Sequence, residues 1–486
     1  MATKLYDAIV STDSTQGDYT LPSAAFNAGK KSIFIRSGTY TETQDIIIPD
    51  GGSIRAETPG GVILNFLGTA FGIKCGSSPA PIASAGSITL TQSSTLVTGT
   101  GTTFTSLVVG NFILVENSYF RIASITDDTN LVINRPFPYI TLTNTSYQIT
   151  NKAVETMGVI SGTNNSNIVT GTGTTFTNLE IGDYISLGTV YARITAITSD
   201  TSLTIFTIYK GITLYNLPYR ALSMFSGITI QNITIYGSTD IGLYVYGCRQ
   251  FNFAFVTISD CKSNLIMENS GNANIGSITS FNSSGVGYTI SNCLSISTFT
   301  MDVVNNTSDG VFVTGDNFSI LFVDVESSGN GGCGFHIDGK TRDTNINKCI
   351  SKYNVNSGFC VSNGAYGMSI DACNSTNNGS YGAELNGDDI ILSGGLIQNN
   401  GDHGIVVNGN ECIIVKNVCK YNNEAIRVSG SSNNISDNIC RNSTTYGVHI
   451  TSTAVNNMVT YNNLTQAGYG TYNDEGTNTL LEGNLA

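Results

Sequence analysis

The sequence predicts an all-β fold, a right-handed parallel β-helix built from coils of about 23 residues. Three observations predict it. The composition is that of strands and turns, with 40% hydrophobic residues, 12% charged residues, 53 Gly and only 8 Pro. From residue 237 onward one phrase recurs, an Asn-rich turn, a small residue and then apolar-x-apolar, as in DGVFVTG and HGIVVNG. These small residues stand 21 to 24 positions apart.

The small residue serves as the anchor of each coil. Apolar residues stand one and three positions after it, as Val311 and Val313 do in one coil and Phe335 and Ile337 in the next. Because alternate residues of a strand share a face, both columns should point inward and the residue between them outward. A helical repeat would need a 3.6-residue period, which is absent. The anchors are Gly242, Asn264, Gly287, Gly310, Gly334, Gly358, Gly382, Gly404, Ala425, Gly447 and Gly470.

A second inward column is expected nine residues before the anchor, where Met301, Val325, Cys349 and Cys373 stand. Ten of the eleven cysteines lie between Cys248 and Cys440, without CxxC or zinc-ligand spacing. We therefore expect free, buried thiols that act as small apolar groups, and no metal or cofactor.

Asparagines recur four residues before the anchor. Stacked amides can hydrogen-bond from coil to coil, each bond contributing about 1 kcal/mol. We expect a structural asparagine ladder of Asn306, Asn330, Asn354, Asn378, Asn400 and Asn422, the last shifted by one position.

The N-terminal part differs from the repeats. Residues 1–84 predict a cap and first coils, with a short helix over about 21–28 that ends at Gly29 and covers the open end of the solenoid. VTGTGTTFT then occurs at 97–105 and again at 169–177, which indicates a tandem pair of inserted β-modules, 85–150 and 151–212. The main β-helix, about eleven coils, is expected over 213–486.

Charge and hydropathy indicate which kinds of partner and location are not expected for this chain. The net charge is −13 without a run of Lys or Arg, so no nucleic-acid partner is expected. No stretch approaches 18 apolar residues, so no membrane span is expected. The N-terminus lacks the apolar segment of a secretory signal peptide, which suggests synthesis in a cytoplasm.

The phrase AFNAGKKSIFIRSGTY followed by GVILNF resembles the start of pectate-lyase-like β-helix proteins of phages and large DNA viruses. The repeats resemble the carbohydrate-binding and sugar-hydrolase β-helix repeat family. The resemblance implies a virion surface or tail fibre protein, tailspike-like or attached to a capsid, that binds a host cell-surface polysaccharide or glycan. It implies assembly in the host cytoplasm, action at the virion surface or outside the cell, contact with other virion proteins, and a homotrimer as one assembly that such proteins form.

Two alternatives remain open. One is an enzyme that degrades or modifies a polysaccharide, as a hydrolase, lyase or epimerase. The other is a passive capsid component without a ligand. Glycosidases need two carboxylates about 5–5.5 Å or 6.5–9.5 Å apart, and no aligned column offers such a pair on adjacent coils. NGDD, GDHG and AIRV only partly resemble polygalacturonase motifs. We therefore favour binding over catalysis.

One constellation predicts a ligand site. Tyr381, His403, Glu424, Tyr446 and Tyr469 stand immediately before the anchors of five successive coils. Tyrosine rings offer sugars a flat apolar face with a polar tip, so Tyr381, His403, Tyr446 and Tyr469 are expected to bind carbohydrate. The catalytic candidates are Glu384, Asp402, His403, Glu424 and Arg427.

Within this constellation His403 should lie beside Glu424, whose carboxylate should raise the histidine pKa. The other two histidines, His336 and His449, are expected to be isolated surface residues.

Overall fold

The computed structural model describes residues 5–485 apart from 77–81, 84, 108, 116–117, 151–153, 156, 188–189, 207, 210–211, 220 and 223–224. The chain divides into two compact units, Met1–Gly76 with Phe225–Ala486, and Ser77–Met224. The module boundaries expected at residues 84 and 151 lie outside the described residues.

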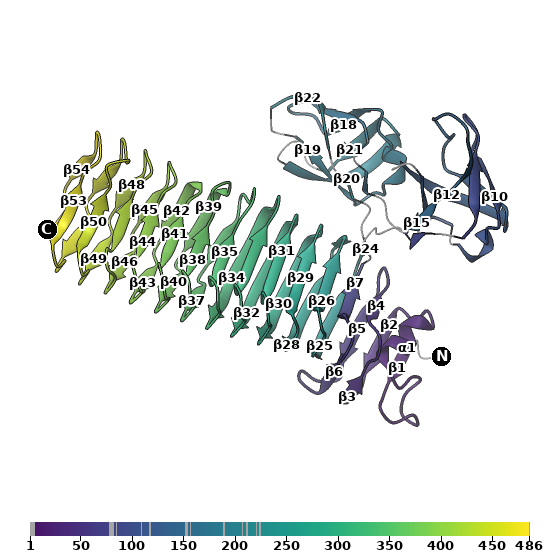
Figure 1. The fold of residues 1–486 in the computed structure, drawn as a ribbon, viewed down its shortest axis with the longest axis horizontal. Helices are drawn as coiled ribbons and strands as arrows, with labels where there is room; N and C mark the ends of the chain where they lie inside the picture. The colour runs from purple at the N-terminus through teal and green to yellow at the C-terminus, as the bar shows by residue number, and fades with distance from the viewer. Residues whose placement is uncertain are drawn as a thin grey trace. The chain divides into compact units, whose positions relative to one another are not determined.

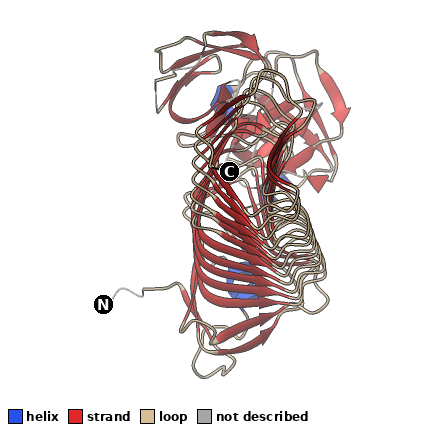
Figure 2. Ribbon diagram, turned by 90° about the vertical axis from the view of Figure 1, so that its left-hand side faces the viewer, coloured by secondary structure: helices blue, strands red, loops and turns tan. Residues whose placement is uncertain are grey.

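The first unit is a parallel β-helix with one sheet of 25 strands and one of 13. Figure 1 shows its coils stacked in chain order from β25 (Thr229–Tyr236) to β54 (Leu480–Glu482), and in Figure 2 the strands lie in register with turns along their edges. The 13-stranded sheet consists of β4 (Ile46–Ile48), β7 (Phe71–Cys75), β26 (Ile241–Tyr246), β29 (Ser263–Glu268), β31 (Tyr288–Ser291), β33 (Val311–Thr314), β35 (Phe335–Ile337), β38 (Phe359–Val361), β41 (Ala383–Leu385), β44 (Ile405–Val407), β47 (Ile426–Val428), β50 (Tyr446–Ile450) and β53 (Gly470–Asp474).

The predicted fold is confirmed. From β26 to β53 the 13-stranded sheet follows the eleven expected coils. The two columns beside the anchors fill the interior, where Val311, Val313, Phe335 and Ile337 are at most 1% exposed. The rings of Phe335 and Phe359, one coil apart, stack with their centres 5.1 Å from each other. The interior therefore depends on like residues packing from coil to coil.

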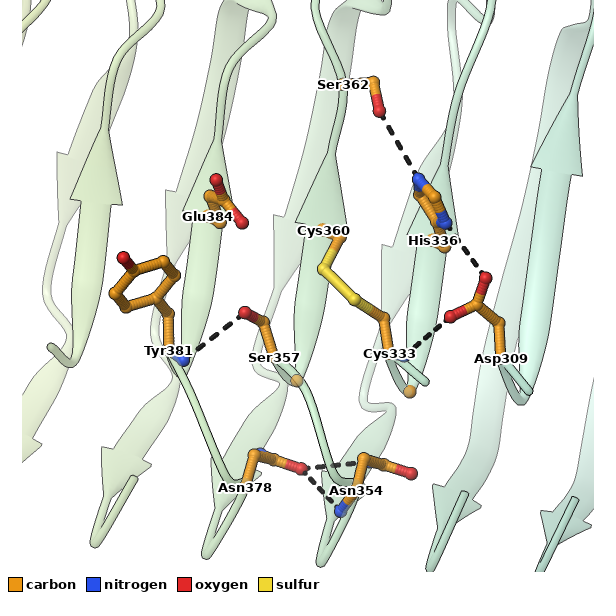
Figure 3. Close-up of a disulfide and its surroundings, with 12 residues drawn as sticks. Asp309, Cys333, His336, Asn354, Ser357, Cys360, Ser362, Asn378, Tyr381 and Glu384 are labelled. Carbon is orange, nitrogen blue, oxygen red and sulfur yellow. Dashed lines mark hydrogen bonds and ion pairs between the residues drawn. A yellow bond between two sulfur atoms is a disulfide. The ribbon is translucent and has the colours of Figure 1, made fainter. Parts of the chain in front are cut away.

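The cysteines follow the prediction only in part. Cys349 and Cys373 are buried neighbours, and the Cys349 N–H donates to Cys373 Sγ at 3.3 Å. Nine cysteines are free and buried, but Cys333 and Cys360 form a disulfide on the outward face of the 13-stranded sheet (Figure 3). The expectation that all thiols are free is wrong because the residue before one anchor meets the outward residue of the next coil.

The six asparagines form a continuous hydrogen-bonded row. Each backbone N–H, from Asn306 to Asn400, donates to the Oδ1 of the next asparagine at 3.0–3.1 Å. All six are at most 5% exposed. A second row at another turn joins Asn417, Asn438 and Asn462 in the same way. Each coil is thus tied to its neighbours by buried amides in addition to its strands.

The N-terminal cap has the expected helix. α1 (Pro22–Asn27) begins with proline in its first turn and buries Ala25 and Phe26. Gly29, at φ +78°, ends it in the left-handed conformation that glycine favours. No helix in the described ranges is long and apolar enough to cross a membrane.

The second unit contains two sheets of eight strands. One runs from β8 (Ile82–Ala83) to β15 (Gln148–Thr150), and the other from β16 (Val154–Glu155) to β23 (Ala221–Leu222). Their contacts repeat at an offset of 72 residues. The Thr105 N–H donates to Asp128 Oδ1 at 3.0 Å, and the Thr177 N–H donates to Asp200 Oδ1 at 3.1 Å. The repeated sequence therefore forms the same turn twice.

We expect Asn354→Ala to lower the free energy of unfolding by about 2–3 kcal/mol, because it removes the acceptor of the buried Asn330 backbone N–H and one of the two donors to Asn378 Oδ1. Urea denaturation followed by circular dichroism would measure it. The control is Asn356→Ala, an exposed asparagine of the same turn, expected to change stability by less than about 0.5 kcal/mol. Equal effects of the two substitutions would contradict a stabilising role of the row.

Candidate functional site

Two rows of side chains define the outward face of the 13-stranded sheet. The pre-anchor row stands immediately before the anchors and comprises Asp309, Cys333, Ser357, Tyr381, His403, Glu424, Tyr446 and Tyr469. The central row is the outward residue of each strand and comprises His336, Cys360, Glu384, Val406, Arg427 and His449. Parallel register brings equivalent positions about 4.8 Å apart, so long side chains reach the next coil.

Glu424 lies at the centre of the predicted constellation and is only 5% exposed. Its Oε1 accepts a hydrogen bond from Nδ1 of His449 at 2.7 Å. Its Oε2 lies 3.6 Å from both His403 Nδ1 and Arg427 Nη1. A buried carboxylate is costly unless it is paired, and here three basic side chains surround it.

Aromatic rings continue this cluster along the row. Tyr381 stacks on His403 with the ring centres 5.6 Å apart and the planes 4° from parallel. The Tyr446 ring lies 5.4 Å from His449 and 6.3 Å from Tyr469. Tyr469 is 79% exposed, so the row passes from a buried acid to an open aromatic surface.

The expected rise of the His403 pKa is wrong. The residue is 8% exposed, and burial lowers its pKa more than Glu424 and Asp402 raise it. Its Nδ1 lies 3.3 Å from Asp402 Oδ1 and makes no hydrogen bond. His403 thus favours the neutral form despite its acidic neighbours.

The remaining candidates are not all brought together. Asp402 is more exposed and accepts a hydrogen bond from Asn423 at 3.0 Å. Glu384 stands in register with Cys360 of the preceding coil and Val406 of the following coil. Val406 therefore separates it from Arg427, which lies one coil beyond. Its only described side-chain hydrogen bond comes from Asn386 at 3.2 Å, so the structure leaves Glu384 outside the Glu424 cluster.

His449 and His336 are not isolated surface residues. The side chain of His449 is 12% exposed and belongs to the Glu424 cluster, and its Nε2 lies 3.7 Å from Glu475 Oε1. Nδ1 of His336 donates to Asp309 Oδ2 at 3.0 Å, and this bond is the main reason that the His336 pKa is raised. Each histidine meets the pre-anchor residue of the preceding coil, a neighbour that comparing like positions does not reveal.

A second site lies on the 25-stranded sheet and was missed. Thr257, Thr279, Asp302 and Glu326 are register partners on β28 (Asn252–Ser259), β30 (Gly271–Phe281), β32 (Leu294–Val304) and β34 (Phe318–Ser328). The first three line a cavity of about 290 Å³ together with the exposed ring of Phe255. The expectation that no column holds two carboxylates on adjacent coils is therefore wrong. Both stand eight residues before an anchor, which is the signal that could have found them.

The two carboxyl groups of this column have different surroundings. Burial, and then the nearby charge of Glu326, raise the pKa of Asp302. Glu326 Oε1 lies 3.1 Å from Lys352 Nζ and accepts a hydrogen bond from Ser328 at 3.0 Å. One group is thus biased toward the acid and the other is paired with a cation.

Among the described residues, no group of three or more His, Cys, Asp or Glu side chains is arranged to hold a metal ion.

Comparison with known proteins agrees with the fold. Residues 340–486 match the family profile described as a right-handed β-helix region. No curated protein matches the chain in sequence. The A-module of the mannuronan C-5 epimerase AlgE6 of Azotobacter vinelandii is 10% identical, with a TM-score of 0.51 over 96% of this chain and 92% of that one. At this identity the likeness shows the fold alone.

Two further solved structures are similar at lower scores. The AlgE4 A-module of the same organism is 10% identical, covering 95% of this chain and 93% of that one, with a TM-score of 0.49. The tailspike protein gp49 of Pseudomonas phage LKA1 is 12% identical, covering 96% and 73%, with a TM-score of 0.43.

We expect His336 to titrate above 6.5 and His403 below it, measured by NMR of labelled histidines assigned with single His→Gln variants. Asp309→Asn should lower the His336 pKa, whereas His403 should not respond. Because the folded-state pKa of His336 is raised, its ionic pairing stabilises the fold fully below about pH 6.5 and is lost as pH rises through the raised pKa. The opposite order of the two pKa values would contradict the assignment.

Proposed function

We propose that the chain binds a neutral polysaccharide along the outward face of its 13-stranded sheet. The observation that carries the proposal is the run of rings on successive coils, Tyr381 on His403, then Tyr446 and the exposed Tyr469, around the buried Glu424. Pyranose rings stack on flat apolar faces, and their hydroxyls bond with polar groups at the edges.

Charge supports a neutral ligand. Asp402, Glu424 and Glu475 outnumber the one permanent cation, Arg427, and the chain carries a net charge of −13. A polyanion would be repelled by this surface, whereas hydroxyl groups can donate to the carboxylates and accept from Arg427.

We further propose that this binding serves a virion surface protein, a fibre or spike that attaches to a host cell-surface polysaccharide and contacts other virion proteins. This part of the proposal rests on the likeness of the N-terminal phrase to viral β-helix proteins, and on that of the repeats to the carbohydrate-binding and sugar-hydrolase β-helix repeat family. The mannuronan C-5 epimerase is similar to this chain in fold alone, so its substrate is not assigned to this chain.

On an array of neutral glycans, wild-type protein should bind a defined set, and Tyr469→Ala and Tyr446→Ala should each weaken binding about tenfold by removing a stacking face. Titration calorimetry with the best ligand would measure the loss. Tyr353→Ala, which removes a tyrosine that is 62% exposed outside both rows, is the control and should bind as wild type does. Equal loss in all three variants, or no binding by wild type, would refute the site.

A second candidate function is glycoside hydrolysis at the cavity of the 25-stranded sheet. The observation that favours it is the register pair Asp302 and Glu326 on adjacent coils, beside the exposed Phe255. Adjacent strands stand about 4.8 Å apart, a backbone spacing from which two side chains can bring their carboxyl groups to the 5–5.5 Å of retaining glycosidases. Asp302 would protonate the leaving oxygen while Glu326 forms the glycosyl ester that water then hydrolyses.

We expect reducing-end release from a panel of neutral polysaccharides to fall at least a thousandfold in Asp302→Asn and Glu326→Gln, because each removes one required role. The matched control is Asp324→Asn, which changes an exposed carboxylate on β34, the strand of Glu326, and should retain full activity. Activity that survives both substitutions, or that Asp324→Asn abolishes equally, would exclude this pair as the catalyst.

A further inference from the structure

Three side chains on successive coils that precede the Glu424 cluster form an ordered polar chain, and two of them, Asp309 and His336, belong to the pre-anchor and central rows. Nδ1 of His336 donates to Oδ2 of Asp309 at 3.0 Å, and Nε2 of the same ring lies 3.4 Å from Oγ of Ser362 (Figure 3). A carboxylate can only accept, so Nδ1 carries a proton, and in the neutral imidazole Nε2 presents its lone pair to the hydroxyl. Carboxylate, imidazole and hydroxyl in this order are the groups that activate a serine nucleophile.

The surrounding backbone fixes this arrangement. The second oxygen of Asp309 accepts the N–H of Cys333 at 2.6 Å. The disulfide from Cys333 to Cys360 ties the coil of His336 to the coil of Ser362, three and two residues from them. A Cβ at Gly332 would lie 2.2 Å from Asp309 Oδ1, so glycine leaves the room that the carboxylate occupies. The three groups are therefore held before any ligand binds.

The three side chains Asp309, His336 and Ser362 are also accessible to solvent. The side chain of His336 is 30% exposed and that of Asp309 18%. Ser362 is half-buried, and Asn363 and Gly364 after it are exposed. The 3.4 Å separation is longer than an ordinary bond to a hydroxyl, as is common for catalytic hydrogen bonds without substrate, which shorten on binding. The Phe312 ring, 5.0 Å from that of His336, gives the face a small apolar edge.

We propose that Ser362 is the nucleophile of a hydrolase for carboxylic esters with a small acyl group, with His336 as the base and Asp309 as the residue that positions it. Ser362 Oγ bonds to the ester carbonyl carbon while its proton moves to His336 Nε2. The carbon–oxygen bond to the alcohol breaks, and the alcohol takes that proton. Water then attacks the acyl group and gives one proton to Nε2, and Oγ regains it as the acid leaves.

The net reaction is ester and water to acid and alcohol, without oxidant or reductant. It goes beyond carbohydrate binding. Only the identity of the alcohol, a sugar hydroxyl of the bound chain, rests on the proposed function. Tests with a simple aryl ester therefore separate the failure of this inference from the failure of glycan binding.

The experiment measures hydrolysis of p-nitrophenyl acetate and labelling by a fluorophosphonate, with the adduct located by peptide mass spectrometry. It is done without reductant so that the disulfide stays closed. We expect one adduct, on Ser362. Ser362→Ala and His336→Gln should lower kcat/KM at least a thousandfold, and Asp309→Asn at least tenfold.

Ser369→Ala on the 25-stranded sheet is the matched control and should keep wild-type rates. Thermal melting would establish that each variant is folded. A folded wild type without an adduct on Ser362 would overturn the proposal, as would hydrolysis that Ser362→Ala leaves unchanged. Labelling of Asp309→Asn at the wild-type rate would overturn the role of that carboxylate.

Discussion

The structure depends on one constraint, the parallel hydrogen-bonded register from coil to coil. It gives each residue the same two neighbours, its equivalents one coil before and one coil after, about 4.8 Å away. The same register also joins strands of the first unit that the second unit separates in the sequence. Leu64 pairs with Ile235 and Cys75 with Val245, although residues 77–224 lie between them in the sequence. Because each coil needs only its neighbours, an insertion at a turn leaves the solenoid intact.

This constraint explains how much the sequence could predict. A period of about 23 residues and the alternation beside each anchor were enough to place Leu243, Phe359 and Val448 in the interior, where all are at most 1% exposed. The asparagine positions were visible for the same reason, since identical residues stack on themselves. What repeats at one position of every coil can be read from a single sequence, because the neighbour of each residue is its own equivalent.

The sites escaped this kind of reasoning because their contacts run diagonally. Asp309 meets His336 and Cys333 meets Cys360 at separations of 27 residues, and Glu424 meets His449 at 25. Each separation is one coil plus three residues, so a pre-anchor residue meets the central residue of the next coil. Aligning like positions therefore placed His336 and His449 beside unrelated side chains. The Asp302 and Glu326 pair needed no diagonal, only the column next to Met301 and Val325.

The residues in diagonal contact are also different from those that stabilise the stack of coils. The asparagine rows bind the coils together with groups that are fully buried and fully paired, which leaves them inert. The diagonal positions need not supply that cohesion, so their occupants vary from a disulfide to acid–histidine pairs. Some groups there are buried and yet keep atoms without hydrogen bonds, such as Oε2 of Glu424 and Nε2 of His449. Reactive side chains are thus carried on a scaffold whose stability is secured elsewhere, and each can change without unfolding the coil beneath it.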